Sequence, residues 1–419
     1  MTNWKEVKLE SIADVIMGQS PKSEYYNAVG DGLPFLQGNR TFGLKYPIFD
    51  TYTTFPTKIA QPQDVIMSVR APVGDLNITP VKMCLGRGVC AMRMKNGHQE
   101  FLYYLMKHNV QNLLNRESGT VFGSVNRNDI GSLGVLVPEN DKIQQKVASV
   151  LSLLDAKIET NTRINNNLEQ QAQALFKSWF VDFEPFGGTM PEDWKVGTFS
   201  EIIDDTIGGD WGKDEAQNNY TEEVYCIRGA DIPDVKIGNK GKMPKRYILT
   251  KNYSSKKLRA GDLVIEISGG SPTQSTGRIA AISDYLLSRY DNKIICTNFC
   301  RALKPKLDYS EYIYHYWQYL YNKNVFFSYE NGTTGIKNLD ISGFLETEKI
   351  SIPNQVVLKK FSELCDKFFK QIYFNGAENE RLSALRDTLL PKLMSGKIDV
   401  SNVDISALTS TDKLSFSED

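Results

Sequence analysis

The chain has 419 residues, enough for two or three domains with full cores, and its 41% hydrophobic and 24% charged residues are ordinary for a globular protein. No apolar run approaches the roughly 20 residues of a membrane span, Met1–Glu10 is polar, and the six cysteines form no CxxC pair, so we expect a cytoplasmic protein without disulfides. The net charge of −1 is low for a nucleic-acid-binding protein, although residues 399–419 carry five acids and one lysine, and the remainder would carry +3.

Residues 1–138 predict a small mixed domain. Short β-like runs, separated by Gly, Pro and Asn, surround one segment with helical spacing of apolar residues. The acidic residues Glu139 and Asp141 then stand where a long helix would begin. The expected strands are Leu33–Gln37, Val65–Arg70, Val89–Met94 and Leu133–Val137, and the expected helix is Gln99–Asn115.

Residues 139–186 predict a long central helix with a seam of apolar residues at a strict seven-residue step. Two asparagines interrupt the seam, and buried seam asparagines usually fix the register of paired helices at some cost in stability. The helix should end near Pro185, because proline cannot continue a helix interior. The seam residues expected here are Leu154, Ile158, Asn161, Asn165, Leu168 and Leu175.

The same pattern then starts again. Residues 187–353 predict a second globular domain, in which Ala260–Ile265 echoes Pro62–Met67. A distal long helix over residues 354–396 repeats the first seam at an offset of 214 residues, including both asparagines, and residues 397–419 predict a disordered acidic tail. The seam residues expected here are Phe368, Ile372, Asn375, Asn379, Leu382 and Leu389.

Two polar seam breaks that recur in register indicate an internal repeat. We therefore predict an α+β fold with two globular α/β-mixed domains, separated by two long helices that pair as an antiparallel coiled coil in a pseudo-twofold arrangement. The alternative is two unrelated amphipathic helices in separate cores. A helix of about 37 residues spans roughly 55 Å, and paired DNA-reading modules stand roughly 34–36 Å apart. Such helices could hold two domains on one duplex, or act as a spacer without DNA.

No catalytic constellation is recognisable in the sequence. There is no GxxxxGK[ST] loop, GxGxxG after a strand or HExxH, and the three histidines are scattered. We expect no catalytic residue, no metal and no cofactor in this chain.

Candidate DNA contacts are cations and amides in loops, since Arg and Lys can reach guanine O6/N7, and Asn and Gln can pair with adenine N6/N7. An ordinary solvated side chain is the alternative for each. The candidates are Lys22, Gln37, Asn39, Arg40, Arg70, Arg87 and Arg127 in the first copy, and Lys213, Arg228, Arg246, Arg278 and Lys337 in the second.

Over nearly all of residues 1–400 the sequence resembles the specificity (S) subunits of Type I restriction–modification enzymes. The resemblance rests on LLDAKIETN at 153–161 and ALFKSWFVDFEP at 174–185, with support from DVIMSVRAPVG at 64–74 and LRDTLLPKL at 385–393. The second copy departs at 266–270, where EISGG replaces the SVRAP of residues 68–72. That difference suits two domains that read different half-sequences.

The resemblance implies that the two globular domains are target-recognition domains, each reading half of a bipartite, asymmetric site in double-stranded DNA. The paired helices would set the unread gap and dock two methyltransferase (modification) subunits, and restriction/translocase subunits would join them. Those partners would hold S-adenosylmethionine, ATP and Mg as an adenine-N6 methyltransferase and ATP-dependent endonuclease. Two alternatives are a coiled-coil scaffold with two protein-binding end domains, and a self-contained DNA-modifying enzyme, whose S-adenosylmethionine motif the sequence lacks.

Overall fold

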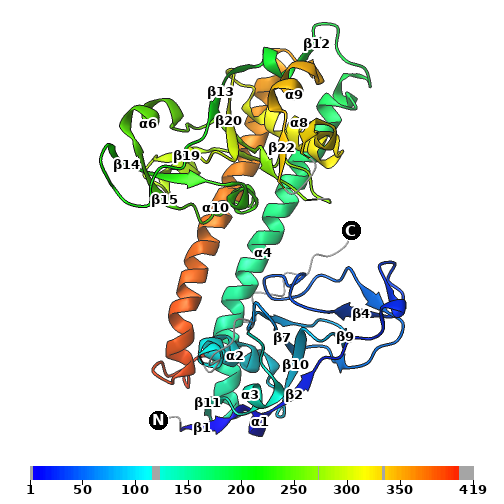
Figure 1. The fold of residues 1–419 in the computed structure, drawn as a ribbon, viewed down its shortest axis with the longest axis vertical. Helices are drawn as coiled ribbons and strands as arrows, with labels where there is room; N and C mark the ends of the chain where they lie inside the picture. The colour runs from blue at the N-terminus through cyan, green and yellow to red at the C-terminus, as the bar shows by residue number, and fades with distance from the viewer. Residues whose placement is uncertain (1–2, 116–122, 272, 333–335, 405–419) are drawn as a thin grey trace. The chain divides into compact units, whose positions relative to one another are not determined.

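The computed structural model describes residues 3–115, 123–271, 273–332 and 336–404 (Figure 1). Contacts divide the chain into two units, each of which takes part of both long helices. Unit 1 comprises Met1–Ala156 and Leu382–Asp419, and unit 2 comprises Lys157–Arg381. No helix in the described ranges is long and apolar enough to cross a membrane.

Unit 1 contains a mixed globular domain made from the residues before the first long helix. The strands and the helix expected in this part of the chain are confirmed to within two residues at each end. The elements are β1 (Trp4–Lys8), α1 (Leu9–Ile12), β2 (Ala13–Met17), η1 (Ser23–Tyr25), β3 (Tyr26–Asn27), β4 (Leu33–Leu36), β5 (Tyr52–Thr53), β6 (Ile59–Ala60), β7 (Val65–Ser68), β8 (Leu76–Ile78), β9 (Met83–Leu85), β10 (Val89–Met94), α2 (Gln99–Leu114), α3 (Arg127–Gly131) and β11 (Gly134–Pro138).

The central sheet of unit 1 has the strand order β2-β10-β7-β8. Successive side chains of a strand face opposite sides of its sheet. Accordingly Val65 and Met67 of β7 pack in one core with Phe101 of α2, whereas Ile66 packs in another with Leu36 of β4. A strand covered on both sides reads as a continuous apolar run, which explains the sequence VIM in β7.

Unit 2 contains a second mixed domain with the same frame. Its central sheet has the order β13-β20-β16-β18, and its two-stranded sheet β12-β23 matches β1-β11 of unit 1. The elements are η2 (Glu184–Phe186), β12 (Lys195–Thr198), η3 (Phe199–Glu201), β13 (Ile203–Gly208), β14 (Tyr220–Ile227), η4 (Gly229–Asp231), α5 (Ile232–Lys236), β15 (Lys245–Leu249), α6 (Thr250–Lys256), β16 (Leu263–Glu266), β17 (Ser268–Gly269), β18 (Ile279–Ala281), α7 (Asp284–Ser288), β19 (Ile294–Cys296), β20 (Cys300–Pro305), α8 (Ser310–Asn322), η5 (Val325–Tyr329), β21 (Glu330–Asn331), β22 (Lys337–Leu339), α9 (Ile341–Thr347) and β23 (Lys349–Ile352).

Strand register places the two copies residue by residue. Ile66 pairs with Ala91 in unit 1, and Val264 pairs with Ala302 in unit 2. Leu36 likewise lies beside Leu85 in a parallel strand pair, as Ile227 lies beside Cys296. The predicted internal repeat is therefore confirmed, and its offset grows from 191 to 211 residues through insertions within the second globular domain.

The long helices are α4 (Asp141–Phe180) and α10 (Gln355–Met394), drawn in teal and orange in Figure 1. Both have 40 residues. Each begins after an asparagine whose side chain accepts a hydrogen bond from a backbone amide of the first turn, at 2.9 Å in both cases. These capping residues, Asn140 and Asn354, stand 214 residues apart, the same offset as the seam.

In unit 2 the two helices pair in opposite directions. Asn161 donates to Asn379 at 2.9 Å, and Asn375 donates to Asn165 at 2.8 Å, so residue numbers rise along one helix as they fall along the other. All four asparagines are buried, as is Ile372. The predicted antiparallel pairing through a shared asparagine seam is confirmed. Ile158 is also buried, and the half-buried seam residues are Leu154, Leu168, Leu175, Phe368, Leu382 and Leu389.

In unit 1 the two helices meet through charge. Arg386 of α10 donates to Asp155 of α4 at 2.7 Å, and Tyr104 of α2 donates to the other oxygen of Asp155, also at 2.7 Å. Val400, in the described part of the predicted tail, belongs to the core of this unit. Residues 405–419 of that tail lie outside the described residues.

Candidate nucleic-acid interface

Four of the candidate DNA contacts of unit 1 gather around one surface cleft. They come from three separate loops: the one after β4, the one after β7 and the turn between β9 and β10. We name this surface the Arg70 cleft. Its lining residues are Gln37, Gly38, Asn39, Arg70, Ala71, Arg87 and Gly88.

Backbone hydrogen bonds tie these loops together. The amide of Gly88 donates to the carbonyl of Gln37 at 3.0 Å, and the amide of Val69 donates to the carbonyl of Gly88 at 2.9 Å. A Cβ atom at Gly88 would lie 2.2 Å from the Gln37 carbonyl oxygen, so this close approach requires glycine. The side chains of the cleft therefore project from a fixed backbone.

The cleft carries positive charge that no acidic side chain of the described residues neutralises. Arg70 and Arg87 are exposed, and no acidic side chain of the described residues forms an ion pair with either. Beside the cleft, Arg40 is paired with Asp50 at 2.8 Å, and its hydrogen bond lowers the pKa of that carboxyl. Two guanidinium groups thus remain available to acceptors outside the chain.

The other candidates of unit 1 do not line the cleft. Lys22 is exposed just before η1 and lies 3.7 Å from Glu24. Arg127 is exposed in the first turn of α3, so the expectation that it occupies a loop was wrong. Asn39 lines the cleft, but its amide donates to Asp75.

The candidate cations of unit 2 differ from those of the Arg70 cleft, because four of the five form ion pairs within the unit. Lys213 is exposed, and its ammonium lies over the ring of Tyr220. Arg246 and Lys337 lie inside strands β15 and β22, so the expectation that they occupy loops was wrong. The pairs are Arg228 with Asp231, Arg246 with Asp214, Arg278 with Glu266, and Lys337 with Glu330.

Two of these pairs neutralise buried carboxylates through two hydrogen bonds each. Arg278 donates to both oxygens of Glu266 at 2.6 and 2.7 Å, and Arg228 donates to both oxygens of Asp231. Burial acts to raise the pKa of Asp231, but hydrogen bonds from Arg228 and from backbone amides outweigh it and lower the pKa. Since a buried carboxylate left unpaired is costly, these arginines are already committed within the fold.

Sequence reasoning missed the residues of unit 2 that correspond to the Arg70 cleft. By strand register, Ser268 stands where unit 1 has Arg70, and Asn298 and Phe299 stand where unit 1 has Arg87 and Gly88. The repeat offset changes from 198 residues at β7 to 211 at β10, so the strand register was needed to align these loops.

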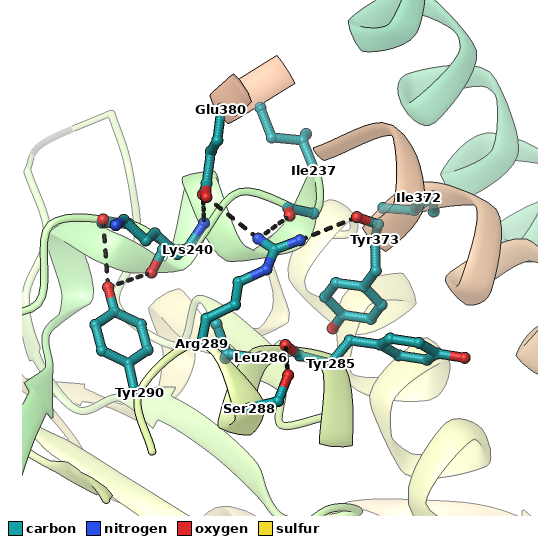
Figure 2. A network of polar contacts seen from close by, with 12 residues as sticks. Ile237, Lys240, Tyr285, Leu286, Ser288, Arg289, Tyr290, Ile372, Tyr373 and Glu380 are labelled. Atoms are coloured by element: carbon teal, nitrogen blue, oxygen red, sulfur yellow. Dashed lines mark hydrogen bonds and ion pairs between the residues drawn. The ribbon is translucent and has the colours of Figure 1, made fainter. Parts of the chain in front are cut away.

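The globular domain of unit 2 is joined to α10 by a polar network (Figure 2). From the residue after α7, the Arg289 guanidinium donates to the carbonyl of Gly238 at 2.8 Å and to that of Tyr373 at 3.0 Å. Glu380 of α10 accepts from Arg289 at 3.4 Å and from the amide of Lys240 at 2.8 Å. The loop after α5 is thereby held against α10, and this contact fixes the position of the globular domain along the helix.

Comparison with known proteins decides the family. The model of the Type I restriction modification DNA specificity domain matches residues 1–170 and again residues 191–384, one match for each copy of the repeat. The chain belongs to this family. It is a DNA specificity subunit of the Type I restriction–modification class, and the two matches agree with the frame that units 1 and 2 share.

Some similar proteins match part of the chain, and others match nearly all of it. The putative Type I restriction enzyme MjaX specificity subunit of Methanocaldococcus jannaschii is 35% identical over 41% of this chain and 41% of its own length. The MjaIX specificity subunit of the same organism is 25% identical over 96% of this chain and 95% of its own. The HindI specificity subunit of Haemophilus influenzae is 26% identical over 71% of this chain and 77% of its own.

A solved structure shares the fold. The S subunit of the Type I restriction–modification system from M. genitalium superposes with a TM-score of 0.54 over 94% of this chain and 96% of its own, at 18% identity. At that identity the likeness concerns the fold alone.

Proposed function

We propose that this chain reads a bipartite, asymmetric DNA sequence for a Type I restriction–modification complex, one half with each unit. The observation that carries the proposal is the Arg70 cleft, where loops tied by backbone hydrogen bonds present two guanidiniums without an acidic partner in the described part of the chain. Arginine recognises guanine by donating to O6 and N7, and each good bidentate contact discriminates against a wrong base by about 1–3 kcal/mol.

The near-neutral charge of the chain fits a division of labour. Phosphate contacts supply much of the affinity of DNA-binding proteins, whereas base contacts supply specificity. A subunit with a net charge of −1 suits base reading inside a complex whose other subunits provide most of the phosphate contacts.

The proposal assigns chemistry to partner subunits. Two methyltransferase subunits dock on the paired helices, hold S-adenosylmethionine, and extrude an adenine for N6 methylation. Restriction/translocase subunits join them with ATP and Mg. This chain is the non-catalytic member, and α4 and α10 set the unread gap between the half-sequences.

The test is to co-express the chain with its methyltransferase subunit and to sequence the modified adenines. Wild type should give one bipartite sequence, and the double variant Arg70→Ala, Arg87→Ala should lose discrimination at a G·C pair in one half, by about 1–3 kcal/mol per arginine. Arg259→Ala is the matched control, because Arg259 is exposed but precedes β16, at the opposite end of the strand from the counterpart loop.

Two results would count against this function. If the methyltransferase fails to co-purify with the chain, or modifies the same DNA with and without it, the scaffold alternative is favoured. If wild type gives a bipartite sequence and the double variant leaves both halves intact, the Arg70 cleft is not the reading surface of unit 1.

A further inference from the structure

We propose that unit 2 reads an A·T base pair through Asn298 and Phe299, on a surface that corresponds to the Arg70 cleft of unit 1. This inference rests on the proposed function and extends it to the chemistry of the second half-sequence. We name the surface the Phe299 surface; its residues are Arg228, Gly229, Ala230, Ser268, Gly269, Asn298 and Phe299.

The backbone of the Phe299 surface repeats that of the Arg70 cleft. In unit 1 the amide of Val69 donates to the carbonyl of Gly88 at 2.9 Å, and in unit 2 the amide of Ile267 donates to the carbonyl of Phe299 at the same distance. A further pair of bonds also matches. The Gly86 amide donates to Leu36 at 2.8 Å, and the Thr297 amide donates to Ile227 at 3.1 Å.

The side chains on this shared backbone differ in kind. Unit 1 has Arg70 and Arg87, which have no acidic partner in the described part of the chain, and unit 2 has Ser268 and Asn298 at these positions. Arg228, in the position of Gln37, is committed to Asp231. The Phe299 surface therefore offers no free guanidinium among its seven residues, and a guanine-reading mode based on arginine is not built into it.

Phe299 is an exposed aromatic side chain on a fixed support. Its side chain stands at the position of Gly88, and the residue is 59% exposed. Its carbonyl accepts from the amides of both Ile267 and Ser268, at 2.9 and 3.2 Å. The backbone of this residue is held in place, and more than half of the residue is open to contact with an apolar group of a ligand.

The pair Asn298–Phe299 matches the major-groove edge of an A·T pair. An asparagine amide can accept from adenine N6 and donate to N7, and an apolar side chain such as phenylalanine can contact the C5-methyl group of thymine. Cytosine lacks that methyl group, and guanine presents two acceptors where adenine presents one acceptor and one donor. The two adjacent residues together therefore select A·T over G·C.

The experiment compares Asn298→Ala and Phe299→Ala chains with wild type in the complete complex, by sequencing the modified adenines. The half-sequence that Arg70→Ala, Arg87→Ala leaves intact is the one assigned to unit 2. Each variant should lower the preference for one A·T pair in that half roughly ten-fold and leave the other half unchanged. Phe299→Leu retains an apolar side chain and should retain most of the preference for thymine.

Leu307→Ala is the matched control, since Leu307 is 83% exposed and follows β20, whereas Phe299 precedes it. A wild-type bipartite sequence with an unchanged second half in both alanine variants would overturn this inference and leave the proposed function standing. Loss of discrimination at a G·C pair would also overturn it. If Phe299→Ala prevents assembly, Asn298→Ala and Phe299→Leu decide the matter by the same criteria. Absence of any bipartite sequence with wild type would reject the proposed function itself.

Discussion

Units 1 and 2 use the same backbone positions to join their globular domain to the long helices, but the chemistry at those positions is opposite. In unit 1, Tyr104 and Arg386 both hydrogen-bond to the buried carboxylate of Asp155. The repeat places His315 at the position of Tyr104, and Phe369 at the position of Asp155. There the imidazole of His315 stacks on Phe369, with ring centroids 5.8 Å apart.

The difference shows which properties a duplicated frame must keep. Backbone position and seam register are retained, because a shift of either helix would displace every seam residue together. Polarity is not retained, because a buried ion pair with its hydrogen bonds satisfied and a stack of rings can fill the same place. A buried pair repays its desolvation only while both partners are present, so the two units should respond differently to substitution.

The largest expected effect is on the polar junction of unit 1. Asp155→Ala leaves the guanidinium of Arg386 buried without its main partner and should lower the free energy of unfolding of unit 1 by about 3–5 kcal/mol. Chemical denaturation of the purified chain measures this. The double variant Asp155→Leu, Arg386→Leu removes both charges from the junction and places an apolar side chain where unit 2 has Phe369, so it should recover most of the loss. A loss below about 1 kcal/mol for Asp155→Ala would mean that the junction is not held by charge.

Unit 2 is also joined to α10 through the Arg289 network, and a somewhat smaller effect is expected there. Arg289→Ala removes the donor to the carbonyls of Gly238 and Tyr373 and should cost about 2–3 kcal/mol. Amide hydrogen exchange should accelerate in the loop 237–241, while unit 1 keeps its protection. Arg163→Ala, at an exposed position of α4, should leave both unchanged. Unaltered exchange in the loop would contradict the fastening role.

The asparagine seam offers a third test, within unit 2. Asn375→Leu leaves the side-chain carbonyl of Asn165 without its donor and should cost about 1–2 kcal/mol. Chemical denaturation is again the measurement. The control is Asn166→Leu, at an exposed position of α4 next to Asn165. A stabilised Asn375→Leu variant with unchanged helix register would show that this asparagine pair is dispensable.

The last effect is a pH dependence that His315 gives to the junction of unit 2. Burial, together with the nearby charge of Lys236, lowers the pKa of His315 from 6.5 to about 3. The unfolded chain therefore binds a proton between these values while the folded chain does not, and stability falls with decreasing pH. The slope from this group is at most about 1.4 kcal/mol per pH unit. Comparing His315→Leu with wild type from pH 6 to pH 4 should show this slope removed; equal slopes would contradict the assignment.

Much of the fold can be predicted from the sequence, because the spacing of apolar residues indicates which side of a helix or strand is buried. The seven-residue step locates α4 and α10, and the apolar runs at Val65–Arg70 and Val89–Met94 locate two buried strands. The residues of the Arg70 cleft could also have been grouped, since the loop after one strand meets the turn before its antiparallel neighbour, as at β7 and β10. These features depend on local sequence and on repetition.

The candidate DNA-reading residues of unit 2 could not be predicted from residue type alone. Whether an arginine is free depends on which acid the fold brings to it, as with Asp214 and Arg246, which are 32 residues apart in the sequence. Candidates chosen by residue type alone therefore included four cations that form ion pairs within unit 2. The register of β16 with β20 was needed to identify Phe299 as the counterpart of Gly88.

The most direct test of two independent reading surfaces is to sequence the DNA modified by three complexes: wild type, Arg70→Ala with Arg87→Ala, and Asn298→Ala with Phe299→Ala. The account predicts one bipartite sequence for wild type, relaxation of one half in the first double variant, and relaxation of the other half in the second. Relaxation of the same half by both double variants, or of both halves by either one, would contradict it.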